Sequence, residues 1–243
     1  MEQFSRAERL FGRAAMEKLA ASRVALFGIG GVGGYVAEAL VRSGLGALDF
    51  FDDDDVALSN LNRQIIATHD TLGMPKVEAM AARLRSINPA ARLEGHALFY
   101  MPENADAVDL APYDYVVDAV DTVAAKLELA VRCQALGVPI ISAMGAGNKL
   151  DPTKLAVTDI YSTVACPLAR VMRRELRKRG IERLKVVYST EPARTPVGEA
   201  ADPGAHSRRS VPGSTAFVPP AMGLIIAAEV VRDLVGALIP DEG

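Results

Sequence analysis

The chain has few of the residues that build disulfide-linked or metal-bound folds. Its 243 residues include no tryptophan, three histidines and two cysteines. Cys133 and Cys166 form no CxxC pair, which argues against a zinc ribbon or a disulfide framework and is typical of a reducing cytoplasm. We expect Cys133 in the core and assign no catalytic role to Cys166. The scattered His69, His96 and His206 indicate neither a metal site nor a triad.

A leader, a membrane-spanning segment and a charge excess are also missing. The N-terminus mixes charges and has no apolar h-region, so no signal peptide is predicted. The apolar stretch at 216–228 is short for a membrane span and predicts a buried helix instead. Because the net charge is −3, any nucleic-acid contact must come from a local basic patch. We therefore expect a cytoplasmic protein without a membrane partner.

Short apolar runs alternate with helical patterns along residues 1–150. Strands are expected at 23–28, 47–52, 113–121 and 138–144, and helices at 5–21, 32–43, 74–87 and 122–136. This alternation predicts an α/β fold with a Rossmann-like, mostly parallel sheet and helices on both faces. The length fits one domain, 1–243, in which 1–150 form the nucleotide-binding core.

Residues 151–243 follow a different pattern, which we interpret as a C-terminal extension. Strands at 154–160 and 184–190 are expected to run antiparallel at the sheet edge, with a basic helix at 167–179 between them. Residues 191–214 are rich in Pro, Gly, Ser and Ala, which predicts a long mobile crossover loop. An apolar helix is expected at 217–239.

A glycine-rich turn follows the first expected strand. Gly28, Gly30, Gly31 and Gly33 allow a tight turn and a close approach of backbone to phosphate. The helix that begins there adds amide donors and the positive end of its dipole. Asp52 ends the next strand, nineteen residues after Gly33, where a carboxylate can bind ribose hydroxyls. The pattern predicts a nucleotide site without choosing the nucleotide.

Charged residues further along favour nucleotidyl transfer over hydride transfer. Arg63 and Lys76 can stabilise the negative charge that gathers on the α-phosphate of ATP during in-line attack. A dehydrogenase has no general need for them. Asp121 ends the expected strand at 113–121, where a carboxylate beside a triphosphate holds Mg²⁺. Asp118, three residues earlier, is the alternative. The sequence therefore predicts an enzyme that uses ATP to adenylate a carboxylate.

These motifs in this order resemble the ubiquitin-activating-enzyme-like superfamily, the relatives of ThiF, MoeB and HesA. The resemblance is carried by GIGGVG, SNLNRQ, GMPK and VVDAVDT. Within the superfamily, RAERLFG, GAGNKLDPTKLAVTDI and PGSTAFVPPAMGL are similar to the subgroup of tRNA threonylcarbamoyladenosine dehydratases. The resemblance covers nearly the whole chain.

The resemblance implies roles for individual residues. Phosphates would contact Gly28, Gly30, Gly31, Gly33, Asn60, Arg63, Gln64 and Lys76, with Arg63 and Lys76 assisting adenylation. Asp52 would bind the ribose and Asp121 would bind Mg²⁺. Arg9 matches an arginine that relatives extend across a dimer interface into the partner's ATP site, which implies a homodimer. The resemblance also points to a monovalent cation as a ligand and a cysteine desulfurase system as a partner.

The implied activity is ATP-dependent dehydration of N6-threonylcarbamoyladenosine in tRNA. Its carboxylate would be adenylated, and the neighbouring carbamoyl group would then expel AMP, which explains why no catalytic cysteine is needed. An adenylyltransferase for a ubiquitin-like sulfur carrier is the alternative, but paired CxxC motifs and a cysteine within 191–215 are both missing. An NAD-dependent oxidoreductase and a nucleotide-binding scaffold also stay open.

One stretch offers a local basic patch for tRNA. In residues 170–185, eight basic residues against two glutamates give a net charge of +6. On a helix, these residues would form a broad basic face suited to phosphate contacts, made by Arg170, Arg173, Arg174, Arg177 and Lys178. Arg208 and Arg209, with His206, lie in the expected mobile loop and are predicted to close over the anticodon arm.

Overall fold

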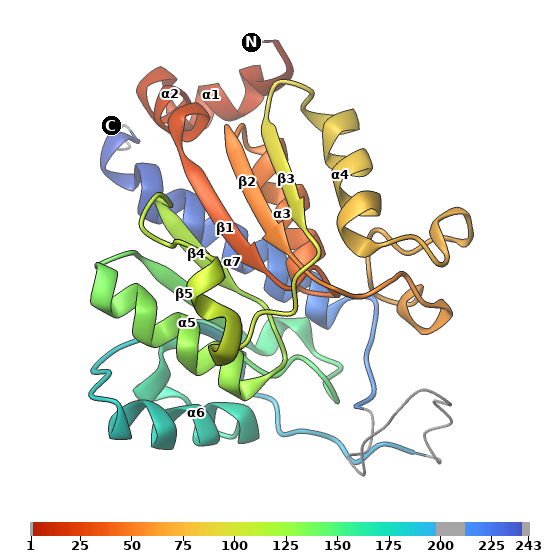
Figure 1. The fold of residues 1–243 in the computed structure, drawn as a ribbon, viewed down its shortest axis with the longest axis vertical. Helices are drawn as coiled ribbons and strands as arrows, with labels where there is room; N and C mark the ends of the chain where they lie inside the picture. Colours follow the sequence, from red (N-terminus) through yellow and green to blue (C-terminus); the bar gives the residue numbers. More distant parts are fainter. Residues whose placement is uncertain (1, 198–211, 240–243) are drawn as a thin grey trace.

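A seven-stranded sheet forms the centre of the computed structural model, which describes residues 2–197 and 212–239 (Figure 1). The strand order is β3-β2-β1-β4-β5-β7-β6. The strands are β1 (Arg23–Phe27), β2 (Ala47–Phe51), β3 (Arg92–His96), β4 (Tyr115–Asp118), β5 (Ile140–Ala143), β6 (Leu155–Asp159) and β7 (Lys185–Ser189). Every neighbouring pair is parallel except β6 and β7. The predicted Rossmann-like α/β fold is confirmed.

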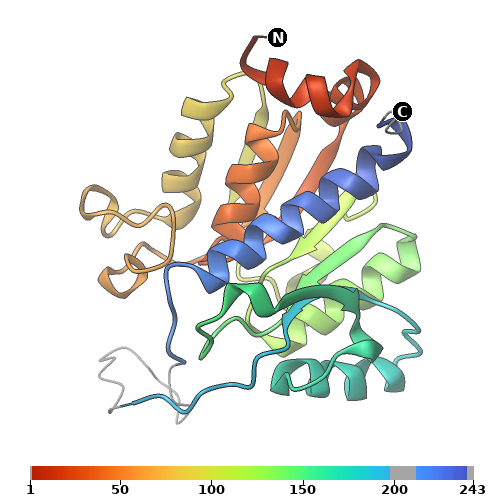
Figure 2. The same cartoon turned by 180° about the vertical axis from the view of Figure 1, so that it is seen from behind.

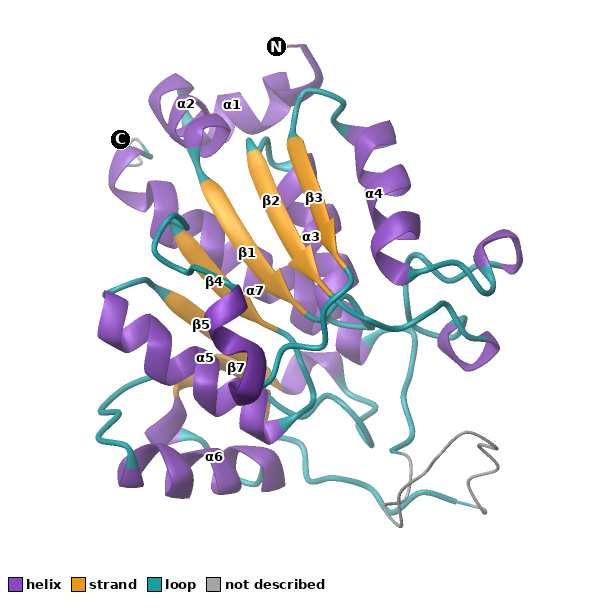
Figure 3. Cartoon of the chain, in the orientation of Figure 1, coloured by secondary structure: helices purple, strands orange, loops and turns teal. Residues whose placement is uncertain are grey.

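Helices cover both faces of this sheet, as predicted (Figures 1 and 2). The helices are α1 (Ser5–Phe11), α2 (Arg13–Ala21), α3 (Gly33–Arg42), α4 (Lys76–Ile87), α5 (Val123–Leu136), α6 (Pro167–Lys178) and α7 (Val218–Val235). Helices α3, α4 and α7 share one apolar core with the sheet, whereas α5 packs on the opposite face and α6 packs against α5. Figure 3 shows the strands enclosed between these two helical layers.

The C-terminal apolar helix is buried against the helix that follows the glycine turn. α3 and α7 approach so closely that a Cβ on Gly223 would lie 2.4 Å from the carbonyl oxygen of Val32. Met222 and Ile226 are fully buried in the same core. The apolar stretch of the sequence therefore forms a core helix, and among the described residues no helix is both long and apolar enough to cross a membrane.

Three local features differ from the expected pattern. The helix expected at 5–21 is divided at Gly12, which has φ +80 and separates α1 from α2. β3 was not predicted, because it is an edge strand in which only Leu93 is buried. The antiparallel pairing of β6 with β7 is confirmed, but β7 also pairs parallel with β5, so β6 alone reverses direction.

The unpredicted strand β3 ends at His96 and places it beside acidic side chains. His96 lies beside Asp49, with Nε2 3.4 Å from the carboxylate, and Glu94 lies close by. The guanidinium of Arg23 already occupies both oxygens of Asp49, at 2.7 and 3.0 Å. His96 is therefore part of an ion-pair cluster rather than isolated.

The two described ends of the expected crossover loop are held in place. The side-chain oxygen of Asn148 accepts a hydrogen bond from the Gly213 amide at 2.6 Å, and the backbone amide of Asn148 donates to the Gly213 carbonyl at 2.7 Å. Its carbonyl accepts from the Arg194 amide at 2.9 Å. The predicted tRNA contacts Arg208 and Arg209, together with His206, lie outside the described residues.

Candidate active site

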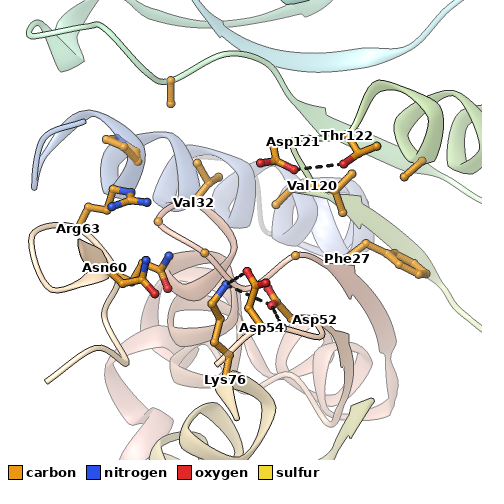
Figure 4. A pocket seen from close by; sticks show the side chains of 18 of the residues that line it. Phe27, Val32, Asp52, Asp54, Asn60, Arg63, Lys76, Val120, Asp121 and Thr122 are labelled. Carbon is orange, nitrogen blue, oxygen red and sulfur yellow. Dashed lines mark hydrogen bonds and ion pairs between the residues drawn. The ribbon is translucent and has the colours of Figure 1, made fainter. Parts of the chain in front are cut away.

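A cavity of about 590 Å³ opens at the carboxyl ends of β1, β2 and β4. Its lining brings together most of the predicted nucleotide-site residues, namely Gly28, Gly30, Gly31, Asp52, Asn60, Arg63, Gln64, Lys76 and Asp121. Figure 4 shows Arg63, Asn60 and Lys76 on one side of the cavity and Asp121 with Thr122 across from them. Ligands of open parallel sheets bind at this edge.

The packing of the glycine turn requires glycine at Gly28 and Gly33 but not at Gly30. Gly28 has φ +83, and a Cβ there would lie 2.7 Å from the carbonyl oxygen of Ala119. A Cβ on Gly33 would lie only 1.8 Å from the carbonyl oxygen of Gly28. Gly33 does not line the cavity, so it serves the turn itself rather than a ligand. Gly30 lines the cavity, and a Cβ there would have only the Gln64 side-chain nitrogen nearby, at 3.7 Å.

Asp52 and Lys76 form the acidic and basic centre of the cavity floor. The Asp52 carboxylate accepts from the Ile29 amide of the glycine turn at 2.9 Å and from the Lys76 ammonium at 3.2 Å. Lys76 also donates to Asp54 at 2.6 Å. Lys76 is only 5% exposed, whereas the Asp54 side chain is 68% exposed. The ammonium can therefore exchange its exposed partner Asp54 for another anion while Asp52 stays fixed to the turn.

The segment between β2 and α4 supplies the remaining polar wall. Arg63 donates to the Ser59 carbonyl at 2.8 Å and to the Asn62 side chain at 3.0 Å. Burial lowers the pKa of the Arg63 guanidinium, which nonetheless stays protonated at neutral pH. Asn60 caps its own turn by accepting from the Ala57 amide at 3.0 Å. Gln64 is buried, and its Oε1 has no hydrogen-bond partner within the described part of the chain.

The two candidate carboxylates after β4 have different surroundings. Asp118 is fully buried and is bound to the Lys126 ammonium at 3.0 Å. It does not line the cavity, whereas Asp121 is exposed and does. Within residues 2–197 and 212–239, Asp121 accepts only a 3.3 Å hydrogen bond, from the Thr122 hydroxyl. Of the two, Asp121 is therefore the carboxylate available to a ligand.

Sequence reasoning missed the apolar wall of the cavity. Phe27 and Phe51 stack with ring centroids 4.4 Å apart, and Leu98, Phe99 and Val120 line the same end. Residues 98–100 follow the unpredicted edge strand β3, so no periodic signal marked them. Aromatic and aliphatic side chains at one end and charged groups at the other suit an amphipathic ligand such as a nucleotide.

The segment 212–214 also lines the cavity and was not predicted to do so. The Ser214 carbonyl accepts from the Asn62 side chain at 3.0 Å. Asn62 accepts in turn from Arg63. The returning end of the crossover loop is thus hydrogen-bonded to the same segment that carries the cavity's arginine.

Arg9 is a predicted site residue that does not line the cavity. It is exposed on α1, at the amino ends of the strands, whereas the cavity opens at their carboxyl ends (Figure 1). The chain's own Arg9 therefore does not complete this cavity.

The predicted basic helix α6 is only partly available to a ligand. Arg173 is half-buried and donates to the carbonyl and hydroxyl of Thr163. Glu175 accepts from Lys178, Arg174 and Arg179, and these hydrogen bonds lower the pKa of its carboxyl to about 2. Arg170 and Arg177 stay exposed. The Arg177 guanidinium lies 4.9 Å from the Tyr161 ring centroid.

Neither cysteine is placed for catalysis. Cys133 is fully buried on α5, and burial raises the pKa of its thiol to about 12. The buried Cys166 precedes α6, where its sulfur accepts from the Ala169 amide at 3.5 Å. Neither lines the cavity.

Comparison with known proteins agrees with this geometry. The tRNA threonylcarbamoyladenosine dehydratase of Bacillus subtilis is 41% identical over 242 residues, covering 96% of this chain and 95% of that protein. The crystal structure of the E. coli dehydratase TcdA with AMP matches with a TM-score of 0.87 and 33% identity, covering 97% of this chain and 95% of that chain. The same protein has also been solved with ATP.

A relative with the alternative activity matches less of the chain. The E. coli sulfur carrier protein ThiS adenylyltransferase is 40% identical over 143 residues, which cover 55% of this chain and 54% of that protein. The family model described as the ThiF family matches residues 4–242. The chain therefore belongs to the ThiF family.

Proposed function

We propose that the protein is an ATP-dependent tRNA threonylcarbamoyladenosine dehydratase, with the whole chain acting as one adenylating domain. The full-length likeness to the Bacillus subtilis dehydratase carries this proposal. The cavity supports it, because the glycine turn, the Asp52 carboxylate beside it, and the side chains of Arg63, Lys76 and Asp121 all line one space. TcdA, whose fold this chain shares, has been solved with both AMP and ATP.

ATP fits the two ends of the cavity. Its base would lie against the apolar end near Phe51, Phe99 and Val120, and its phosphates would approach the backbone at Gly30 and Gly31. Asp52 would accept from the ribose hydroxyls, since its carboxylate already lies at the turn. The buried Oε1 of Gln64, which has no hydrogen-bond partner among the described residues, fits a polar ligand in the same space.

Asp121 is the residue that would hold Mg²⁺. It is exposed to the cavity, and from the described part of the chain it receives a single weak hydrogen bond, from a neighbouring hydroxyl, which leaves its oxygens able to coordinate a hard cation. Mg²⁺ would supply charge neutralisation for the triphosphate.

Adenylation and cyclisation follow as two displacements. An oxygen of the substrate carboxylate attacks the α-phosphorus of ATP and pyrophosphate leaves. Arg63 and Lys76 stabilise the charge on the α-phosphate oxygens in this step. The carbamoyl group then attacks the activated carbonyl carbon within the same nucleoside, loses a proton and expels AMP. The net change to the base is the loss of one water.

A second protomer would contribute Arg9. Because Arg9 lies at the opposite edge of the sheet from its own cavity, it can reach a nucleotide only from a partner chain in a homodimer. Binding of a monovalent cation, contact with a cysteine desulfurase system and a cytoplasmic location remain predictions of the sequence.

The decisive experiment measures AMP release from ATP and Mg²⁺ with tRNA that contains threonylcarbamoyladenosine and with the same tRNA lacking it. We expect AMP only with the modified tRNA, and a product nucleoside lighter by one water in mass spectrometry. ATP binding without tRNA-dependent AMP would contradict the proposal and favour a protein carboxylate, such as the C-terminus of a sulfur carrier.

The exposed part of α6 is the proposed tRNA contact. The amino end of α6 lies near Gly145, where a Cβ would be 3.9 Å from the Cys166 sulfur, and the next residues, Ala146 and Gly147, line the cavity. Arg170 lies one turn further along the helix. For the double variant Arg170→Glu/Arg177→Glu, we expect tRNA affinity to fall by about 10- to 100-fold at low salt, because each phosphate contact depends on charge. Nucleotide binding should stay unchanged.

The matched control reverses two exposed arginines on other helices, Arg13→Glu/Arg85→Glu. Filter binding over a range of salt concentrations compares the two variants. Equal affinity losses in both would indicate a non-specific charge effect, and no loss in the α6 variant would place the tRNA elsewhere.

The proposal also predicts that no thioester forms on this chain. Cys166→Ser should keep AMP formation within about twofold, because a serine hydroxyl caps a helix at least as well as a thiol. Iodoacetamide should leave both buried cysteines of the native protein unmodified in intact-mass measurements. Complete loss of activity in Cys166→Ser would instead indicate a covalent intermediate.

A further inference from the structure

A buried polar cluster beneath the cavity has no role in the steps described so far. Its members are Lys126 on α5, Asp118 at the end of β4 and Ser142 on β5, each at most 1% exposed. The Lys126 ammonium lies 3.0 and 3.1 Å from the two Asp118 carboxylate oxygens, 3.3 Å from the Ser142 hydroxyl and 2.7 Å from the Ala143 carbonyl. The Ser142 hydroxyl donates to Asp118. Buried charges are costly, so such a cluster calls for a functional explanation.

The cluster bridges the turn that carries Asp121. At the start of this turn, Asp118 accepts a hydrogen bond from the Val120 amide at 3.3 Å. At its end, the Lys126 amide donates to the Thr122 carbonyl at 3.1 Å in the first turn of α5. That second bond is an ordinary backbone bond of the helix, but the Lys126 side chain also pairs with Asp118 at 3.0 Å. The ion pair therefore joins the residue just before the 119–122 turn to the first turn of the helix that follows it.

The same turn packs directly on the glycine turn that follows β1. The Ala119 carbonyl oxygen lies 2.7 Å from where a Cβ on Gly28 would be, and its Cβ lies 3.3 Å from the corresponding position on Gly33. The Ala119 amide donates to the Phe27 carbonyl at 2.8 Å. The distance between Asp121 and the glycine turn therefore depends on where residues 119–122 are anchored.

A second wall of the cavity depends on the same ammonium group. Lys126 holds the Ala143 carbonyl at the end of β5, and Ala146 and Gly147, three and four residues later, line the cavity. None of the three cluster side chains lines the cavity itself. Any effect on the reaction must therefore pass through the segments that they anchor.

We propose that Lys126, Asp118 and Ser142 are one positioning unit that sets Asp121 against the glycine turn, and so governs nucleotidyl transfer rather than ATP capture. This inference rests on the proposed adenylation. Because a misplacement of about 1 Å at a reacting centre can cost about 100-fold in rate, small shifts of the 119–122 turn should act on kcat.

The test replaces the ion pair by apolar side chains in Asp118→Leu/Lys126→Met. Such replacements often leave stability unchanged, so folding and positioning can be separated. We expect a thermal transition near that of the wild type, ATP affinity within about threefold, and kcat for AMP formation lowered by about 100-fold. The Mg²⁺ concentration for half-maximal rate should rise, a change that a purely structural role would not produce.

The matched control is Arg23→Met/Asp49→Leu, which removes an ion pair 2.7 Å apart and away from the cavity, whose carboxylate is 1% exposed. It should leave kcat and the Mg²⁺ dependence unchanged. If the first double variant does not fold, Ser142→Ala removes one hydroxyl from the cluster and should lower kcat by about tenfold without unfolding.

A stable Asp118→Leu/Lys126→Met variant with wild-type kcat and Mg²⁺ dependence would overturn the inference, as would a wild-type kcat in Ser142→Ala. The comparison uses whichever carboxylate substrate supports AMP formation by the wild type. Failure of tRNA as that substrate would therefore count against the proposed function and not against the positioning unit.

Discussion

Lys76→Met is expected to lower kcat for AMP formation by about 100- to 1000-fold, the usual effect of removing one preorganised donor to a developing negative charge. Lys76 is the only lysine among the described residues that line the cavity. Its ammonium is preorganised, because Asp52 holds it at 3.2 Å and the surrounding protein leaves it 5% exposed. Rapid-quench measurement of a single turnover would report the chemical step directly.

Two companion variants separate the charge of Lys76 from its structural effect. Asp54→Asn weakens only the exposed partner of Lys76, so kcat should change by less than about threefold. Lys18→Met removes a lysine that pairs with Asp114 away from the cavity, and should match the wild type. Thermal unfolding checks that Lys76→Met remains folded. A folded Lys76→Met with wild-type kcat would exclude Lys76 from the transfer step.

Alanine substitutions at two glycines of the same turn should have different effects, one on stability and the other on ATP binding. For Gly33→Ala, a Cβ 1.8 Å from a backbone oxygen forces the turn apart, so we expect a loss of about 3 kcal/mol or more in unfolding free energy. For Gly30→Ala, the new methyl group points into open cavity space. It should leave stability unchanged and weaken ATP binding by about 10- to 100-fold, because it occupies space that a phosphate would take.

Urea unfolding and a nucleotide-binding titration measure both variants. Gly236→Ala is the control, since nothing lies within 4 Å of a Cβ there and the site is remote from the cavity. Unchanged ATP affinity in a folded Gly30→Ala would show that the phosphates do not approach this part of the turn. Full stability in Gly33→Ala would contradict the packing described for the turn.

Most of the central sheet could be predicted because its signals are local. β1 and β4 are continuous apolar runs, as expected for strands buried on both faces, and the glycine turn follows β1 directly. β3 gave no such signal, because an edge strand exposes most of its side chains. The apolar segment 98–100 follows that strand and depends on it for its position. Because the strand could not be predicted, the apolar wall of the cavity could not be predicted either.

The basic helix shows why composition alone could not define a binding surface. Eight basic residues in 170–185 predicted a broad positive face. The structure places Glu175 within hydrogen-bonding distance of three of them and turns Arg173 towards Thr163. The net charge counts every basic group equally, whereas the availability of each group for a phosphate depends on which side chains the fold places beside it.

The sequence by itself determined the order of strand, glycine turn, helix and acid, because backbone preference and hydrophobic periodicity act over a few residues. It also placed Asp52, Arg63, Lys76 and Asp121 at strand ends and in the loops beyond them, where a parallel sheet binds ligands. Only the tertiary structure shows that Asp118 is buried against Lys126 while Asp121 faces the cavity. That difference, like the closure of the cavity by residues 212–214, depends on contacts between segments distant in the chain, which no local pattern records.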